Sequence, residues 1–246
     1  MEWSDEAIIL AARPHGEGHA VVDLFTPERG RWAGLVFGGS GRRMAPIVQP
    51  GNSVQAVWQG RLEESLGNFN LELTVPRAAH VMQERLCLAG LSAACAMAVA
   101  CLPEREPHEN TYRAMEVLLS NFEDLDIWPA LMARWELGLL GDMGFGLTLD
   151  RCVATGSRDN LVYVSPKSAC AVSKEAGAPY KDKMLMLPSF LKGDGGDISL
   201  GSALEALNTT GYFIETRILH LINQTLPEAR IRVISLLQEK AQTVID

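Results

Sequence analysis

The chain has 246 residues, of which 47% are hydrophobic and 21% are charged. That length is enough for one large domain or two modest ones with a buried core, and the composition is that of an ordinary globular protein. The formal net charge of −8 argues against a protein that coats nucleic acid by its bulk charge. Any affinity for phosphate groups must therefore come from a local excess of cations.

The cysteines and the apolar segments indicate where the protein works. An odd number of cysteines, placed within apolar runs, suits a reducing cytoplasm better than a disulfide framework. No cationic segment precedes an apolar one at the N-terminus, so we expect no secretory signal. Residues 86–102 carry no charge, but the segment is short for a membrane span and is dominated by small side chains. We therefore predict a cytoplasmic protein without a membrane segment.

Residues 1–78 carry the pattern of a small β domain. Short apolar or alternating runs are separated by turns rich in glycine and proline. Phe69, Leu71 and Leu73 alternate with polar residues, which is typical of a strand with one buried face. The expected strands cover residues 7–12, 21–26, 31–37, 53–59 and 69–74. Short strands joined by glycine-rich turns predict a closed five-stranded barrel, with the OB-fold as the leading candidate.

After Pro76 the apolar period changes from two to about 3.6, so residues 79–246 are predicted to form a helical domain. We expect helices near residues 78–101, 108–122, 127–143, 200–208, 211–224 and 228–241. The uncharged segment 86–102 should be a helix covered on all sides. The predicted fold class is α+β, with the barrel followed by a helical domain, and we expect residues 80–246 to fold as one unit.

A degenerate zinc ribbon is predicted within the helical domain, at about residues 149–180. Two turns resemble C-x-x-C, but a hydroxyl residue replaces the second cysteine of each. The turns are Cys152-Val-Ala-Thr155 and Cys170-Ala-Val-Ser173. A structural zinc site needs four thiolate or imidazole ligands, and neutral hydroxyls are not among them. We therefore expect no zinc and no other cofactor.

No catalytic constellation is visible in the sequence. His15 and His19 flank Glu17, but the intervening glycines indicate a loop, which does not hold two imidazoles on one face as a metal-binding helix does. Residues 38–43, Gly-Gly-Ser-Gly-Arg-Arg, lack the Lys-Ser/Thr ending of a phosphate-binding P-loop. No serine lies in a G-x-S-x-G turn. We predict that the protein is not an enzyme.

Four arginines are the candidates for binding phosphates: Arg29, Arg31, Arg42 and Arg43. The first two lie at a turn, and the last two lie in the glycine-rich break at the other end of the same expected strand. Such loops border the binding face of a small barrel, where arginine pairs with phosphates or stacks on bases. Trp32 and Phe37 are the candidates for base stacking. The alternative is that these arginines form only a solvated rim.

Two segments carry a resemblance to a known family. One is residues 128–152, an apolar helix followed by Gly-Phe-Gly-Leu-Thr-Leu and then Cys152. The other is residues 13–39, RPHGEGHAVVDLFTPERGRWAGLVFGG, with its Gly-Glu turn, its strand ending in Phe-Thr and its Gly-Arg pair. Together they resemble the RecO family of bacterial recombination mediators, and the match covers most of the chain.

The resemblance implies a protein of DNA repair and recombination that acts after DNA damage in the RecFOR pathway. Such proteins bind and anneal single-stranded DNA through the barrel. With RecR they help to load recombinase onto strands coated by single-strand-binding protein. An alternative from another class is a non-enzymatic interaction scaffold whose barrel binds a peptide or RNA, and the acidic net charge favours that alternative.

The resemblance also implies that a groove of the helical domain captures the acidic, aromatic C-terminal tail of single-strand-binding protein. The candidate residues for this contact are Arg113, Arg134 and Arg217, which lie on or beside apolar stripes. Ordinary surface arginines are the alternative. The late basic cluster of the family is reduced here to residues 227–232, Pro-Glu-Ala-Arg-Ile-Arg, which puts the affinity for the tail in question.

Overall fold

The computed structural model describes residues 1–193 and 198–245. The chain forms two compact units, of which the first holds residues 1–123 and 227–230 and the second holds residues 124–226 and 231–246. The change from strands to helices falls at Pro76, where the sequence predicts it. The first unit nevertheless extends well past residue 78, because the first helices pack with the barrel.

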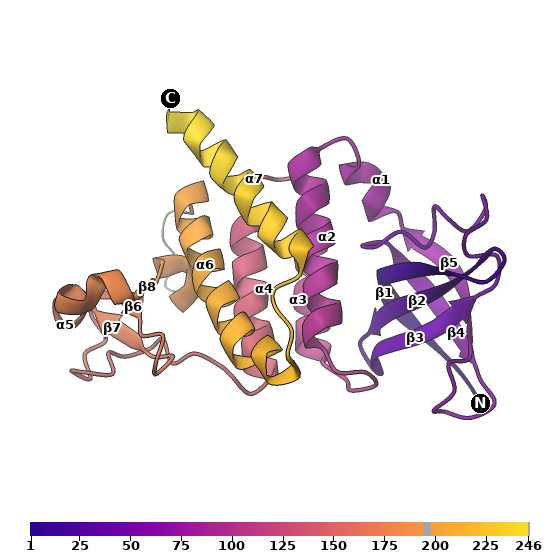
Figure 1. The fold of residues 1–246 in the computed structure, drawn as a ribbon, viewed down its shortest axis with the longest axis horizontal. Coiled ribbons are helices and arrows are strands. Elements are labelled where there is room, and N and C mark those ends of the chain that lie inside the picture. The colour runs from indigo at the N-terminus through magenta and orange to yellow at the C-terminus, as the bar shows by residue number, and fades with distance from the viewer. Residues whose placement is uncertain (194–197, 246) are drawn as a thin grey trace. The chain divides into compact units, whose positions relative to one another are not determined.

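The first unit begins with a closed barrel of five strands (Figure 1). The strands are β1 (Glu2–His15), β2 (His19–Thr26), β3 (Gly30–Val36), β4 (Ser53–Gln59) and β5 (Asn68–Val75). Their order is β1-β2-β3-β5-β4, and β1 closes the barrel by pairing with β4 along its first half and with β2 along its second half. This double pairing explains why β1 is longer than the sequence predicts. The five predicted strands and the OB-type barrel are confirmed.

The barrel interior at the start of β1 is an aromatic cluster. Trp3, Trp32 and Trp58 have ring centroids 5.4–6.0 Å apart, and Phe69 lies 5.9 Å from Trp3. Trp32 and Trp58 are almost completely buried, and the indole N–H of Trp58 donates to the carbonyl of Leu66 at 3.0 Å. Large rings are thus the main filling of this end of the barrel.

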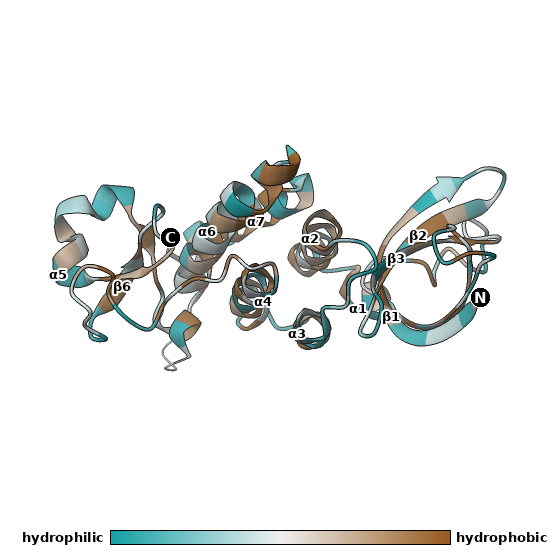
Figure 2. Ribbon diagram, turned by 90° about the horizontal axis from the view of Figure 1, so that it is seen from below, coloured by the Kyte–Doolittle hydropathy of each residue, from teal (hydrophilic) through white to brown (hydrophobic). Residues whose placement is uncertain are grey.

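Three helices complete the first unit: α1 (Arg77–Val81), α2 (Arg85–Cys101) and α3 (Glu109–Leu119). The helix predicted at residues 78–101 is interrupted at residues 82–84, which separate α1 from α2. α2 is apolar around most of its circumference (Figure 2) and buried along most of its length, as predicted. No helix in the described ranges is both long enough and apolar enough to cross a bilayer.

The loop between α2 and α3 holds the helices against the barrel. Gly30, at the start of β3, approaches this loop so closely that an added Cβ would lie 1.8 Å from the carbonyl oxygen of Glu106. The Nε of Arg31 donates to the carbonyl of Leu102 at 2.9 Å, and the backbone N–H of Arg105 donates to the carbonyl of Arg31 at 2.8 Å. The barrel and these helices therefore pack as one body.

The second unit is built on α4 (Trp128–Asp142) and α6 (Leu200–Arg217), which pack against each other (Figure 1). Buried Thr210 of α6 donates to the carboxylate of buried Glu136 of α4 at 2.5 Å. The two helices predicted at 200–208 and 211–224 are a single helix as far as Arg217, followed by the 3-10 turn η3 (Leu219–Ile222). Gly211 does not end the helix, because it lies in the buried part of α6.

A small sheet occupies the segment in which the degenerate ribbon is predicted. β6 (Leu161–Val164) lies between β7 (Ala171–Ser173) and β8 (Leu185–Met186). The connecting segments are α5 (Lys174–Gly177) and η1 (Ala178–Lys183), and η2 (Ser189–Lys192) follows β8. The last helix, α7 (Glu228–Ile245), covers the helix predicted at 228–241.

Candidate nucleic-acid interface

One end of the barrel is formed by the β1–β2 turn, residues 15–19, and by residues 37–43 after β3. We call it the Phe37 end. Phe37 is 61% exposed, and its ring meets that of His19 edge to face, with centroids 5.3 Å apart. The backbone N–H of Gly38 donates to Nδ1 of His19 at 3.1 Å, and the hydroxyl of Ser40 donates to the carbonyl of His19 at 2.8 Å. The Phe37 loop is thus fastened to the neighbouring hairpin.

Arg42 and Arg43 lie on a helical turn that begins at this fastened loop. Backbone N–H groups at residues 44, 45, 47 and 48 donate to carbonyls three or four residues earlier. The turn buries Val48 against the barrel core and partly buries Met44 and Ile47. Arg42 and Arg43 are exposed, and neither has an ion-pair partner among the residues that the structure describes. The turn therefore presents two uncompensated cations to solvent.

Arg29 and Arg31 lie at the opposite end of β3, which we call the Trp3 end. A strand of seven residues spans about 20 Å, so these two side chains do not join Arg42 and Arg43 in one patch. The guanidinium of Arg29 lies over the ring of Trp3, 5.2 Å from its centroid. It is half-buried.

Arg31 is held by carboxylates and by the α2–α3 loop. Its Nη1 lies 3.3 Å from Asp23 and 3.3 Å from Glu104, and its side chain is only 15% exposed. Arg13 shares the same buried Asp23 at 2.7 Å. These contacts neutralise Arg31 within the fold, so its position does not favour a role in phosphate binding.

Trp32 lies inside the barrel, at 3% exposure, with the guanidinium of Arg105 stacked 4.5 Å from its ring centroid. Its ring therefore offers no face on which a base could stack. The sequence did not reveal that Trp32 is buried, because alternation along β3 does not say which set of side chains points inward. Phe37, one residue past the strand, points outward instead. The structure thus separates the two predicted stacking residues.

The three arginines predicted to contact partner proteins lie in different surroundings. Arg113 of α3 pairs with Glu6 at 2.7 Å and with Glu116 at 3.0 Å. Arg217 of α6 donates to the carbonyl of Lys167 at 3.0 Å. Arg134 is exposed on α4. Arg113 belongs to the first unit and the other two to the second, so each must be considered by itself.

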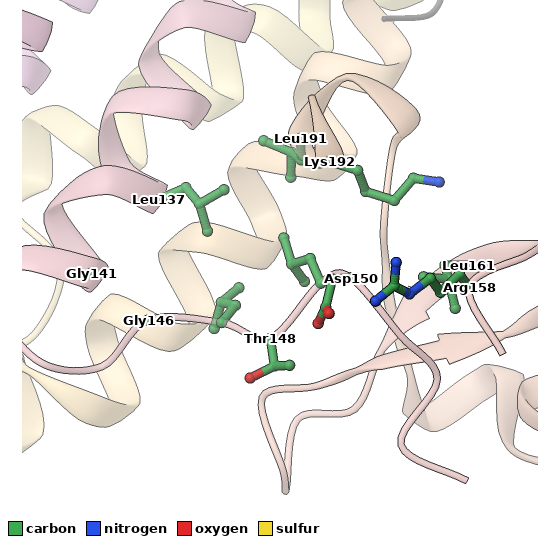
Figure 3. A pocket seen from close by; sticks show the side chains of 11 residues that line it. Leu137, Gly141, Gly146, Thr148, Asp150, Arg158, Leu161, Leu191 and Lys192 are labelled. Atoms are coloured by element: carbon green, nitrogen blue, oxygen red, sulfur yellow. The ribbon is translucent and has the colours of Figure 1, made fainter. Parts of the chain in front are cut away.

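A cavity of about 750 Å³ lies in the second unit, beside α4 (Figure 3). Leucines from α4, from the segment before the small sheet, from β6 and from η2 make up its apolar lining. These are Leu137, Leu147, Leu149, Leu161 and Leu191. Asp150, Arg158 and Lys192 also line it, on the side away from Leu137 in Figure 3. Arg158 and Lys192 were not found from the sequence, because nothing in their local pattern indicates a pocket.

The buried thiol of Cys152, beside the small sheet, accepts hydrogen bonds from its neighbours. The backbone N–H of Ser173 donates to its Sγ at 3.3 Å. Burial acts to raise the pKa of Cys152, but hydrogen bonds from the Thr155 hydroxyl and from the backbone N–H groups of Ser173, Thr155 and Ala154 outweigh it and lower the pKa to about 6. In the described part of the chain, no group of three or more His, Cys, Asp and Glu side chains is placed to hold a metal.

The strand order and the following helices define the class: a small OB-type barrel joined to a helical body with a minor sheet. Residues 1–76 match the family description "Recombination protein O N terminal", and residues 82–225 match "Recombination protein O C terminal". The chain belongs to the RecO family of DNA repair and recombination proteins.

Relatives in this family resemble the chain over almost its full length. A "DNA repair protein RecO" of Caulobacter vibrioides is 46% identical over 239 residues, which cover 97% of this chain and 98% of the relative. Proteins of the same name from Roseobacter denitrificans and Xanthobacter autotrophicus are 46% and 47% identical over 235 residues. These cover 95% and 96% of this chain, and 97% and 96% of the relatives.

Proposed function

We propose that the protein is a non-enzymatic recombination mediator of the cytoplasm that binds and anneals single-stranded DNA at the Phe37 end of its barrel. The observation that carries the proposal is the combination of two uncompensated arginines with an exposed aromatic ring on one fastened segment, residues 37–43. Arginines that pair with phosphates and rings that stack on bases are the two components of single-strand binding. Arg29 and Arg31 lie at the other end of β3, so the proposed DNA-binding site consists of Arg42, Arg43 and Phe37.

The proposed mechanism is one of positioning. Arg42 and Arg43 hold the phosphate backbone, Phe37 receives an unpaired base, and the second unit holds partner proteins. A strand and a partner bound to one chain meet at a high local concentration, without any bond being made or broken by the protein. With RecR, the protein would in this way help recombinase to replace single-strand-binding protein.

The cavity of the second unit supports the proposed capture of the acidic, aromatic tail of single-strand-binding protein. Its leucines suit an aromatic side chain, and Arg158 and Lys192 suit carboxylates. Arg134 lies one turn of α4 before Leu137, on the side of the helix that continues to Gly141.

Annealing of complementary DNA strands by the purified full chain tests the proposed function. We expect the parent protein to accelerate annealing and the double variant Arg42→Gln/Arg43→Gln to do so much more weakly. A matched control is Arg61→Gln/Arg85→Gln, which removes the same charge from two exposed arginines of the first unit that lie outside residues 37–43. Annealing that is equal in all three proteins, or absent from the parent while RNA or a peptide binds, would favour the scaffold alternative.

A further inference from the structure

His19 contacts both the exposed ring of Phe37 and the backbone beside it. His19 contributes the ring that packs edge to face on Phe37, with an interplanar angle of 88°. Its Nδ1 accepts the backbone N–H of Gly38, the residue directly after Phe37, at 3.1 Å. The first contact is with the ring itself, and the second is with the residue that follows it.

The backbone of the same hairpin adds two further contacts to the loop. The hydroxyl of Ser40 donates to the carbonyl of His19 at 2.8 Å, and the backbone N–H of Ser40 donates to the carbonyl of Gly18 at 3.1 Å. Because Nδ1 of His19 is an acceptor here, its ring carries its proton on Nε2 in this arrangement. Gly38 has a φ of 68°, so the chain can turn sharply after Phe37 and leave the ring facing outward.

A ring that is fixed before binding loses little freedom when a ligand stacks on it, so more of the stacking energy appears as affinity. Stacking of one base on an aromatic side chain contributes about 1–3 kcal/mol. Bases within a duplex already stack on one another, so an aromatic side chain on the protein surface stacks on unpaired bases rather than on paired ones. A fixed ring therefore favours single strands over duplex, whereas Arg42 and Arg43 attract the phosphates of both.

We propose that His19 is the positioning residue of the strand-binding site, and that by fixing Phe37 it gives the barrel a preference for unpaired bases. The inference rests on the proposed function, since it concerns the same end of the barrel. His19 acts through Phe37 and contributes two separable contacts, the hydrogen bond from Gly38 and the edge-to-face ring contact.

Binding of a single-stranded oligonucleotide with an internal 2-aminopurine, and of a duplex of the same sequence, tests this inference with the full chain. In the parent, stacking on Phe37 should change the 2-aminopurine fluorescence. Phe37→Ala should abolish that change and weaken single-strand binding about 5- to 150-fold, which is the stacking contribution converted at about 1.4 kcal/mol per tenfold. Duplex binding should hardly change.

His19→Ala should reduce the fluorescence change and weaken single-strand binding in the same direction as Phe37→Ala, by a smaller factor, again with little effect on duplex. His19→Asn restores an acceptor for the Gly38 N–H, and His19→Phe restores only a ring. Each should recover part of the single-strand preference. Partial rescue by either variant separates positioning from a general loss of fold.

The outcomes distinguish this inference from the proposed function. If Phe37→Ala loses the stacking signal while His19→Ala behaves as the parent does, the positioning role is wrong and the strand-binding site stands. Equal weakening of single-strand and duplex binding in His19→Ala would also overturn the positioning role. If Phe37→Ala and Arg42→Gln/Arg43→Gln both bind as the parent does, the strand-binding site itself is wrong.

Discussion

Arg42 and Arg43 differ in their surroundings from Arg13, Arg29 and Arg31. Arg13 and Arg31 share the buried carboxylate of Asp23, and Arg29 lies on the ring of Trp3. A guanidinium that is already paired with a carboxylate gains little binding free energy by exchanging that carboxylate for a phosphate. Among the four arginines predicted to bind phosphates, Arg42 and Arg43 are exposed and have neither an ion pair nor a stacked ring in the described chain, so their removal should alter DNA binding.

The first prediction concerns the salt dependence of single-strand binding. Each phosphate contact contributes about 0.7 to the slope of log affinity against log salt on single strands, so Arg42→Gln/Arg43→Gln should flatten the slope by about 1.4. Titration of a fluorescent oligonucleotide at several salt concentrations measures it. The midpoint of urea unfolding should hardly move, because both side chains are exposed. An unchanged slope, equal to that of Arg61→Gln/Arg85→Gln, would contradict the prediction.

A second prediction at this scale concerns the thiol of Cys152. Its pKa in the folded protein, about 6, is below the value of about 8.5 for an unfolded thiol. A depressed pKa stabilises the fold fully above the unfolded value, and that stabilisation is lost as the pH falls towards 6. We expect the urea midpoint to fall between pH 8.5 and pH 6 in the parent, and to fall less in Cys152→Ser.

Cys170→Ser is the control for this thiol, since Cys170 donates to the carbonyl of Ser168 and is only partly buried. If the urea midpoint of the parent changes with pH just as that of the Cys152→Ser variant does, residue 152 is not a thiolate in the folded protein. The chain is still expected to hold no stoichiometric zinc, because Thr155 and Ser173 replace two thiolates. Metal analysis of the purified protein checks this.

At the scale of single elements, α4 has an unexpected composition. Gly138 lies in the middle of the helix, is exposed, and has nothing within 4 Å of the position that a Cβ would take. Glycine in a helix interior costs about 1 kcal/mol relative to alanine. We predict that Gly138→Ala raises the free energy of unfolding by about that amount, as measured in urea. A destabilised variant would mean that the backbone here needs glycine for a reason internal to the fold.

The cavity beside α4 leads to a separate prediction about partner binding. A synthetic peptide rich in aspartate and ending in phenylalanine should bind the full chain, and Arg158→Glu should weaken that binding by at least tenfold. Fluorescence anisotropy of the labelled peptide measures it. Lys174→Glu, which reverses an exposed cation outside the cavity lining, is the control. If Arg158→Glu and Lys174→Glu bind the peptide equally well, the tail binds outside this cavity.

The barrel strands also show which structural features the sequence pattern could predict. Alternation at Phe69, Leu71 and Leu73 and the turn glycines were enough to predict the barrel strands, because a strand with one buried face repeats every two residues. The pattern could not place Trp32 inside the barrel, since that depends on the register of β3 with its neighbours. Nor could it predict that Asp23 and Glu104 would hold Arg31, because the latter contact joins residues far apart in the chain.

At the scale of the whole molecule, the first unit joins the barrel to α1, α2 and α3. The Sγ of buried Cys95 in α2 lies 3.8 Å from the carbonyl oxygen of Ile9 in β1, and Leu91 packs on Gly51. The predicted domain boundary after residue 78 would cut through these contacts. The residues matched by the two family descriptions nevertheless divide near Pro76, at the same change from strands to helices.

We therefore predict that a fragment of residues 1–123 is more stable than a fragment of residues 1–78. The shorter fragment exposes the face of β1 that α2 covers and lacks the loop that contacts Gly30 and Arg31. Urea unfolding of both fragments tests the prediction. Equal midpoints would show that the barrel folds without its helices. Limited proteolysis of the full chain should also avoid residues 86–102, because a buried helix offers no site to a protease.

The aromatic cluster at the Trp3 end has an optical consequence. Three indoles with centroids 5.4–6.0 Å apart are close enough for their excited states to couple, which gives circular dichroism a paired signal of opposite signs. Trp3, Trp32 and Trp58 all belong to the first unit, whereas Trp128 and Trp135 belong to the second. The barrel thus contains its own spectroscopic reporter, which follows its integrity in every variant proposed above without an added label.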